Sequence, residues 1–224
     1  MNDLSEKETV EAIRNWWQEN GKFIIAGIVL GVGGLVGWNQ WQAHEAEEAE
    51  SASAVFEKLV AAVENGSEYD AKAHAATLAE QYAATPYALQ ARLAMAKFYM
   101  DQGESEPAAT ELRALVQDGE PPVSLIARHR LARVLLYQDK PEEALAVLDV
   151  PDAGAFRPRF LELRGDAQFA LGRAGEARES WTAAIAEPGD PPLIDTRLVQ
   201  MKLDELGAPA VAEAVTGTPE GGAP

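Results

Sequence analysis

One uncharged, mostly apolar run near the N-terminus, from Phe23 to Trp38, constrains this chain more than any other feature. It reads FIIAGIVLGVGGLVGW, and no charged side chain separates Lys22 from His44. A membrane-spanning helix needs roughly 20 predominantly apolar residues, and the uncharged stretch reaches that length when its polar end lies among the lipid headgroups. Tryptophans flank the run on both sides, as membrane–water interfaces favour: Trp16, Trp17, Trp38 and Trp41. We therefore predict one transmembrane helix over residues 23–43.

The distribution of basic residues predicts the orientation of this helix. Three precede the run, whereas the first one after it comes only at Lys58. The positive-inside rule places the basic side in the cytoplasm. We expect residues 1–22 to form a cytoplasmic amphipathic segment, with a helix over residues 5–20 that ends at Gly21, and the remainder to lie outside. The three basic residues are Lys7, Arg14 and Lys22.

Two other interpretations of the run are weaker. A cleaved signal peptide has a basic start and a small-x-small cleavage site close behind its apolar region. Here five acidic residues accompany the three basic ones, and the first good site, Ala52-Ser53-Ala54, lies far beyond the run. A buried helix of a soluble protein would lose up to about 1 kcal/mol at each of its glycines. A retained membrane anchor accounts for these features better.

The glycines of the run are spaced in a way that favours contact between membrane helices. Gly27 and Gly31 are four residues apart, as are Gly33 and Gly37. Small residues at this spacing let two helices approach closely, so these four are candidates for transmembrane packing. The alternative is that glycine is simply common in membrane helices.

Composition excludes several classes of function. The chain has 224 residues, a net charge of -17 and no cysteine. The acidic balance argues against nucleic-acid binding and against adhesion to anionic lipid. The lack of cysteine excludes disulfides, thiolate metal sites and cysteine nucleophiles.

The chain beyond residue 43 shows an internal repeat. Helical patterns alternate with turns at Gly103, Asp139 and Gly172, and no strand alternation appears, so we predict an all-α fold. Three small residues recur 36 and 33 residues apart, with a small residue twelve positions before each and a large one four positions after each. A period near 34 with this pattern predicts a tetratricopeptide-like α-solenoid over residues 44–206. The three sets are Ala96, Ala108 and Leu112; Ala132, Ala144 and Leu148; and Gly165, Ala177 and Trp181.

Both ends of the predicted solenoid have their own features. No Gly or Pro occurs from Trp38 to Asn65, so we expect the membrane helix to continue outward until Gly66 and to begin a degenerate first repeat. A last helix within 191–206 is expected to cover the open end of the stack. The Ala-, Gly- and Pro-rich segment 207–224 is expected to be a disordered tail. The expected covering residues are Leu193, Leu198, Met201 and Leu206.

No reactive constellation emerges from the sequence. The histidines His44, His74 and His129 fall in separate segments, and neither a phosphate-binding glycine loop nor a nucleophile elbow is present. We expect no enzyme, no cofactor and no metal site. The first helices of such repeats line a concave surface that binds peptides, although a solvated polar face would look the same in the sequence. The residues placed there by the repeat register are Lys97, His129, Arg133, Tyr137, Glu162 and Asp166.

Several segments in fixed order resemble one known family, the YfgM-like ancillary subunits of the bacterial Sec translocon, over about residues 8–206. The resemblance implies a single-pass, type II protein of the bacterial inner membrane with a periplasmic repeat domain. It also implies association with Sec translocon subunits and with a membrane-anchored periplasmic chaperone, and transfer of exported client proteins to periplasmic chaperones. The segments are Val10-Glu11-Ala12, Asn20-Gly21-Lys22, Gly27 to Trp38, Ser51-Ala52-Ser53, Leu131 to Val134, Leu163 to Asp166, Ala177-Arg178, Ser180-Trp181 and Met201-Lys202.

The sequence thus favours a membrane-tethered, non-enzymatic adaptor or chaperone-like protein beside the export channel. A tetratricopeptide scaffold for another cell-envelope complex has the same anchor and repeats and remains the alternative. A transporter is disfavoured because one span is too little for a transport path, and an enzyme is disfavoured because the sequence has no reactive constellation.

Overall fold

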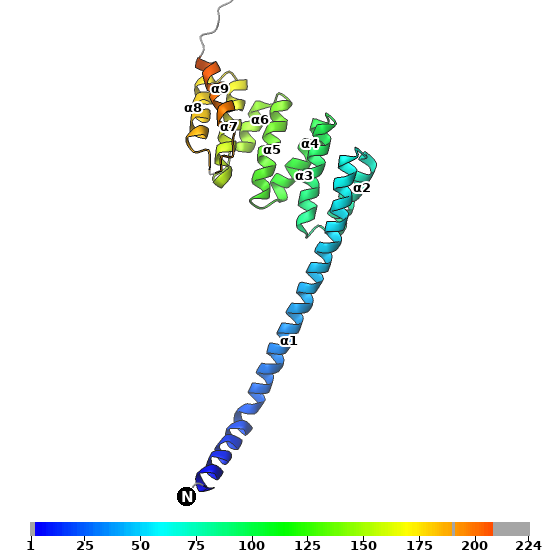
Figure 1. Cartoon of the computed structure of the whole chain (residues 1–224), viewed down its shortest axis with the longest axis vertical. Helices are drawn as coiled ribbons and strands as arrows, with labels where there is room; N and C mark the ends of the chain where they lie inside the picture. Colours follow the sequence, from blue (N-terminus) through cyan, green and yellow to red (C-terminus); the bar gives the residue numbers. More distant parts are fainter. Residues whose placement is uncertain (1–2, 190, 208–224) are drawn as a thin grey trace, which may run out of the picture.

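The protein is all-α in the computed structural model, which describes residues 3–189 and 191–207 and contains no strand within them (Figure 1). The predicted fold class is confirmed. The tail expected over 207–224 lies, beyond Gly207, outside the described residues. The elements are α1 (Asp3–Glu64), α2 (Glu68–Gln81), α3 (Pro86–Asp101), α4 (Ser105–Asp118), α5 (Val123–Tyr137), α6 (Pro141–Leu148), the 3-10 turn η1 (Gly154–Phe156), α7 (Arg157–Ala170), α8 (Ala174–Ala186) and α9 (Thr196–Gly207).

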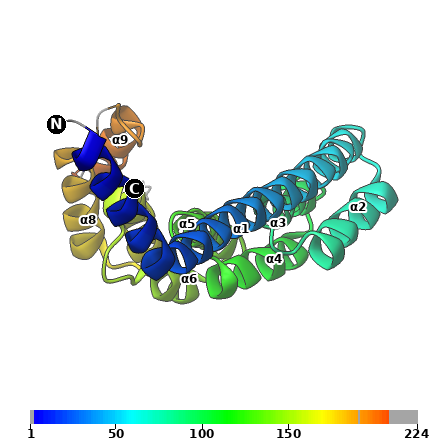
Figure 2. The ribbon, with the colours of Figure 1, turned by 90° about the horizontal axis from the view of Figure 1, so that it is seen from below.

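The helices after α1 stack as hairpins into a curved array. The end of α1 packs on α2, and α3 on α4, α5 on α6 and α7 on α8 follow in chain order, with α9 against α8. Seen from below in Figure 2, α4, α6 and α8 lie on the outer side of the arc, and α3 and α5 lie on its inner side. In the hairpins α3–α4 and α5–α6, the first helix therefore faces the hollow of the arc.

α1 is a rod of which only the C-terminal part touches the domain. Every residue from 25 to 47 is exposed, and full burial begins at Ala52 and continues at Leu59. By length and composition, Thr9–Glu64 contains a segment that is long and apolar enough to cross a membrane, and only 6% of that segment is buried. The core helix of a soluble protein would be mostly buried, so this apolar surface suits lipid instead. The rod ends at Glu64, just before Gly66, as expected.

The helix end predicted at Gly21 is wrong, because α1 runs through this position without a break. A Cβ atom at Gly21 would lie 3.1 Å from Cε2 of the Trp17 indole, one turn earlier. The indole lies over the bare backbone of this turn. The glycine therefore marks a close approach of a ring and not the end of a helix.

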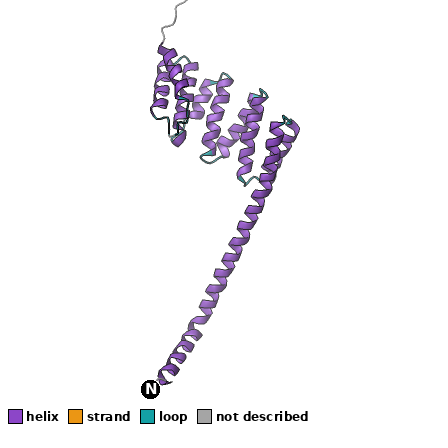
Figure 3. Cartoon of the chain, viewed as in Figure 1, coloured by secondary structure: helices purple, strands orange, loops and turns teal. Residues whose placement is uncertain are grey.

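The four hairpins share one turn, drawn among the short teal connections of Figure 3. In each turn a residue with positive φ donates its N–H to the carbonyl three residues earlier, and the next N–H bonds the carbonyl five residues earlier, at 2.8–3.1 Å. This Schellman arrangement satisfies the last carbonyls of the first helix and reverses the chain. It confirms the three predicted turns and adds the first hairpin to the series. The positive-φ residues are Gly66 (69°), Gly103 (78°), Asp139 (57°) and Gly172 (73°).

The small and large residues of the repeat pattern lie in the core. Ala108, Ala144 and Ala177 are fully buried. The third repeat shows why small residues are needed: a Cβ at Gly165 would lie 2.4 Å from the Trp181 ring. Trp181 on α8 therefore packs directly on the backbone of α7, which draws the two helices of this hairpin together.

The face with which α9 covers the end of the stack differs from the predicted one. Val199 and Leu203 are buried, whereas Leu198 and Met201 are 42% and 60% exposed. Leu206 packs only partly against the same cluster, and Ile194, before the helix, is buried. The helix is thus rotated relative to the expected register, because its contacts are set by Trp181 and Ala184 of α8 and not by a repeat partner.

Candidate functional site

Two adjoining pockets hollow the inner side of the arc, and Arg130 and Arg133 of α5 line both of them. We call these two pockets together the inner groove. The first has a volume of about 460 Å³ between α3, α4 and α5, and the second about 750 Å³ between α5, α7 and α9. These volumes are in the range of pockets that hold a small ligand or a few side chains of a peptide.

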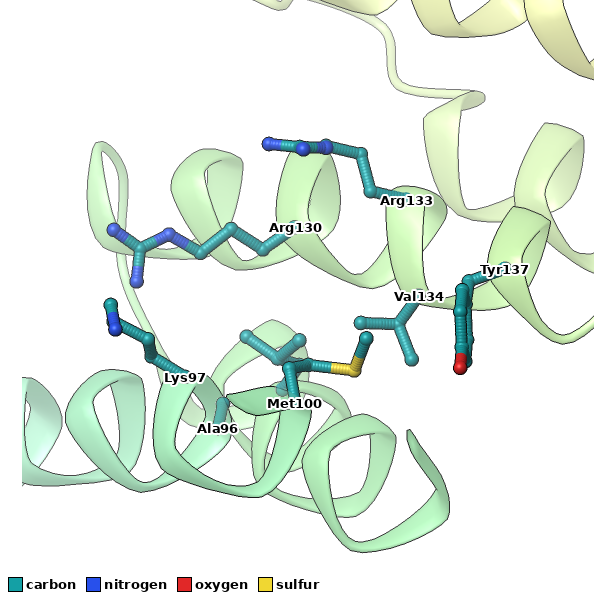
Figure 4. Close-up of a pocket in the computed structure, with 8 residues that line it drawn as sticks. Ala96, Lys97, Met100, Arg130, Arg133, Val134 and Tyr137 are labelled. Carbon is teal, nitrogen blue, oxygen red and sulfur yellow. The ribbon is translucent and has the colours of Figure 1, made fainter. Parts of the chain in front are cut away.

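The first pocket combines an apolar base with a basic rim (Figure 4). Met100 and Val134 face each other across it, and Lys97 and Arg130 extend side by side at one end. Tyr137 stands at the other end, with 68% of its surface exposed. No carboxylate lines this pocket within the described residues. Its chemistry therefore suits an apolar side chain flanked by negative charge.

The second pocket holds more charge of both signs. His129, Arg130, Arg133 and Arg159 line it together with the acids Glu162 and Asp166. Phe156, Leu163 and Leu198 supply apolar surface. The Nε of Arg159 donates to the carbonyl of Leu193 at 2.9 Å, which holds its guanidinium at the pocket wall.

The acids of the second pocket are already partnered. Lys202 of α9 donates to both carboxylate oxygens of Asp166, at 2.7 and 2.9 Å, and to Oε1 of Glu162 at 3.2 Å. All three side chains are at least three-quarters buried, and the Trp181 indole N–H donates to Asp166 Oδ1 at 3.0 Å and to the Glu162 carbonyl at 3.1 Å. This network ties α9 and α8 to α7. The single charge of Lys202 offsets one of the two carboxylate charges beside the arginines of the groove.

The pKa of His129 reflects burial of the ring first and the positive charges of this wall second. Burial, and then the nearby charges of Arg133, Arg159 and Arg130, lower it from 6.5 to about 4. Burial and positive neighbours both disfavour the imidazolium form. The ring is consequently neutral at pH 7 and adds no positive charge to the groove.

This pKa predicts a loss of stability in mild acid. Between pH 6.5 and about 4, His129 of the unfolded chain binds a proton, whereas His129 of the folded chain does not. The contribution of the neutral ring to the free energy of unfolding is therefore fully present above pH 6.5 and is lost as the pH falls towards 4. The full shift corresponds to roughly 3 kcal/mol, which solvent screening of the partly exposed ring reduces to about 1–2 kcal/mol. Urea denaturation of wild type and His129→Gln at pH 7 and pH 4.5 measures it. The stability difference between the two proteins should move in favour of the variant at pH 4.5; parallel pH profiles would contradict the shift.

The structure places all six predicted groove residues in the inner groove. Lys97, Arg133 and Tyr137 line the first pocket, and His129, Arg133, Glu162 and Asp166 line the second. Four charged residues that line the groove escaped the sequence analysis: Arg130, Arg159, Asp195 and Lys202. The repeat register offers no equivalent of Arg130 with the same charge, since Leu163 occupies that position one repeat later. Lys202 belongs to α9, which lies outside the repeat, so no spacing argument could place it.

The four predicted packing glycines lie on the exposed part of α1. A Cβ added at Gly27, Gly31, Gly33 or Gly37 would meet nothing within 4 Å. At about 100° per residue, Gly27 and Gly31 share one side of the helix, and Gly33 and Gly37 share another. The surface at each pair of glycines is therefore open to an approaching helix.

Among the described residues, no group of three or more His, Asp or Glu side chains is arranged to hold a metal ion.

The comparisons with known proteins cover the rod and the repeats together. The tetratricopeptide repeat-like domain family matches residues 14–208. Several relatives carry the name ancillary SecYEG translocon subunit. The one from Escherichia coli K12 is 32% identical to this chain over 206 residues, which cover 90% of this chain and 97% of the relative. The Haemophilus influenzae relative is 31% identical (91% and 98% covered) and the Neisseria gonorrhoeae relative 29% (91% and 98%). No solved structure matches the chain. The chain therefore belongs to the tetratricopeptide repeat-like proteins, and among them to the YfgM-like family, whose curated members are named ancillary subunits of the SecYEG translocon.

Proposed function

We propose that this protein is a membrane-tethered, non-enzymatic adaptor that associates with the Sec translocon. One observation carries the proposal: similarity to the named translocon subunits covers about 90% of this chain and nearly the whole of each relative, so the anchor and the repeats are shared as one unit. The groove supports it, since it offers a binding surface without a nucleophile or a metal cluster in the described part of the chain.

We further propose the topology that the basic residues predict. Residues 1–22 lie in the cytoplasm, residues 23–43 cross the inner membrane, and the repeats from residue 44 lie in the periplasm. A retained anchor is supported over a cleaved signal peptide by the place of the candidate cleavage site: Ala52 is fully buried inside α1, where a peptidase needs an extended and accessible chain.

The rod gives this tether a defined reach. From Ala43 to Ala52, the first fully buried residue, the helix is continuous, and at 1.5 Å per residue the domain begins about 14 Å from the end of the span. A groove held at that height beside a channel exit meets emerging chains at roughly millimolar effective concentration. Exported client proteins would be bound early and passed to a membrane-anchored periplasmic chaperone. The paired glycines of the span offer a close approach to a helix of the translocon or of that chaperone.

A mild-detergent pull-down from native membranes tests the association. The full-length protein is compared with a variant in which the order of residues 23–38 is scrambled, so that length and hydropathy are kept and the glycine spacing is lost. We expect translocon subunits and a periplasmic chaperone to co-purify with the wild type and to be depleted at least tenfold with the variant. Recovery of the translocon with neither protein would refute the proposal. Recovery of a different envelope complex would support the alternative, a tetratricopeptide scaffold for that complex.

A further inference from the structure

The arginines of the inner groove stand out because most other basic side chains of the repeat domain are engaged. Among the basic residues from 44 to 207, nine pair with a carboxylate, and Arg128, Arg159 and Arg178 donate to backbone carbonyls. The four left without either kind of partner within the described chain are Lys58, Arg130, Arg133 and Arg197. Two of these four lie together in the groove, one turn apart on α5.

The basic side chains of the groove outnumber its acids among the described residues. Arg130, Arg133, Arg159 and Lys202 face Glu162, Asp166 and Asp195 in the second pocket, and Lys97, Arg130 and Arg133 line the first pocket without an acid. Glu162 and Asp166 are held by Lys202, and Asp195 accepts the backbone N–H groups of Arg197 and Leu198 at 3.0 and 3.2 Å. Arg159 adds a third guanidinium from the facing helix α7, and it forms no ion pair with an acid of the described chain. The local charge is therefore positive although the chain as a whole has a net charge of -17.

This local charge decides what approaches the groove. The Debye length is about 8 Å at physiological ionic strength, so the acids on the distant surface are largely screened at the groove. Guanidinium groups bind carboxylates through two parallel N–H···O bonds, which a lysine-lined surface does not offer. Between the charges, Met100, Val134 and Leu163 provide apolar surface for side chains of the same ligand.

We propose that Arg130, Arg133 and Arg159 form a docking site for an extended, acidic segment of a partner polypeptide. The proposal rests on the adaptor function above and names the chemistry that the adaptor recognises. Neighbouring helices are 8–10 Å apart, about three residues of extended chain, so carboxylates three positions apart would meet α5 and α7 in turn. The apolar residues between them would enter the two pockets.

Fluorescence anisotropy with labelled peptides tests the site. The full-length protein in nanodiscs of zwitterionic lipid is titrated into an eight-residue peptide with glutamates three positions apart and leucines between them, and into its twin with glutamines. The glutamate peptide should bind at least tenfold more tightly than its twin, and the difference should shrink between 50 and 300 mM salt. Equal binding of the two peptides would overturn the proposal.

A matched pair of variants assigns the site. Arg130→Gln with Arg133→Gln should abolish the preference for the glutamate peptide, whereas Lys58→Gln with Arg197→Gln removes the same charge from exposed, unpaired positions outside the groove and should preserve it. All four side chains are exposed, so the fold is expected to survive, and thermal melting checks this. Equal loss in both double variants would overturn the proposal as a general charge effect. Displacement of both peptides alike by phosphatidylglycerol vesicles would overturn it in favour of a lipid site.

The acidic-peptide site and the adaptor function can each fail without the other. If the native pull-down finds no translocon but the peptide preference depends on the two arginines, the adaptor function at the translocon fails and the acidic-peptide site stands. If the translocon co-purifies and the preference is absent, the site fails and the adaptor function stands.

Discussion

A chain that begins at His44 is expected to leave the membrane fraction and to keep its fold, whereas a chain that begins at Gly66 is expected not to fold. The first truncation removes the exposed part of α1, where every residue from 25 to 47 is exposed and contributes no core contact. The second also removes Ala52, Leu59 and Ala62, which are at most 7% exposed. The two outcomes separate the anchoring role of α1 from its role as the first helix of the solenoid.

The second truncation uncovers an entire face of the next helices. Ala71 and Leu78 of α2 and Met95 of α3 pack in the same cluster as Leu59. A single buried leucine cut to alanine costs about 3 kcal/mol, and removal of the whole helix exceeds the 5–15 kcal/mol by which a domain is usually stable. Without its first helix, the array also exposes a long apolar surface at its end, which promotes aggregation.

Carbonate extraction of membranes and thermal melting by circular dichroism measure the two effects. A chain in which an unrelated apolar helix of equal length replaces residues 23–43 is the control for anchoring, and it should return to the membrane pellet. Retention of the chain from His44 in the carbonate-washed pellet would show that the repeat domain itself binds the membrane. A cooperative melt of the chain from Gly66 would contradict the role given to Leu59.

The repeat could be predicted from sequence because its determinants are local and recur at fixed spacing. Gly103, Asp139 and Gly172 each mark a backbone position with positive φ, and such positions restrict residue choice strongly enough to be visible without a structure. The small residues that precede the large ones by sixteen positions are equally visible, since close helix packing excludes larger side chains there.

The sequence analysis failed where a residue is constrained by a contact outside the repeat. Gly21 is required by the close Trp17 ring and not by a helix end. Either cause would favour a glycine, so the sequence alone does not distinguish them. Apolar residues lie on two sides of α9, and packing against Trp181 of α8 decides which side is buried. The sequence of α9 alone does not specify this choice. The roles of Glu162 and Asp166 also depend on α9, because only its placement brings Lys202 to them.

Gly165→Ala is expected to destabilise the repeat domain, although alanine is the better helix former. The added Cβ would lie 2.4 Å from Cδ1 and Nε1 of Trp181. The ring cannot move away easily, because its N–H is bonded to the Glu162 carbonyl and Asp166 Oδ1 and because 2% of the residue is exposed. Overpacking of a core costs about 1–3 kcal/mol, which exceeds the gain of up to about 1 kcal/mol in helix propensity.

Trp181→Ala should cost more, about 3–5 kcal/mol, because it empties the space between α7, α8 and α9. The informative measurement is the double variant. Once the ring is gone, the same Gly165→Ala change meets no clash, so it should stabilise the Trp181→Ala background by about 0.5–1 kcal/mol. Gly165→Ala is thus expected to lower stability when Trp181 is present and to raise it when Trp181 is absent. Urea denaturation of the four proteins, each beginning at His44, gives the coupling free energy directly.

Gly175→Ala is the matched control for this cycle. Gly175 lies in α8, and a Cβ there would meet nothing within 4 Å. Its replacement should therefore leave stability unchanged or raise it by up to about 1 kcal/mol, with or without Trp181. If Gly165→Ala behaves like Gly175→Ala in the wild-type background, the close approach of Trp181 to α7 is not what requires a glycine at this position. If the two differ as expected, the small residue of the third repeat is explained by one ring, held by α7 and covered by α9.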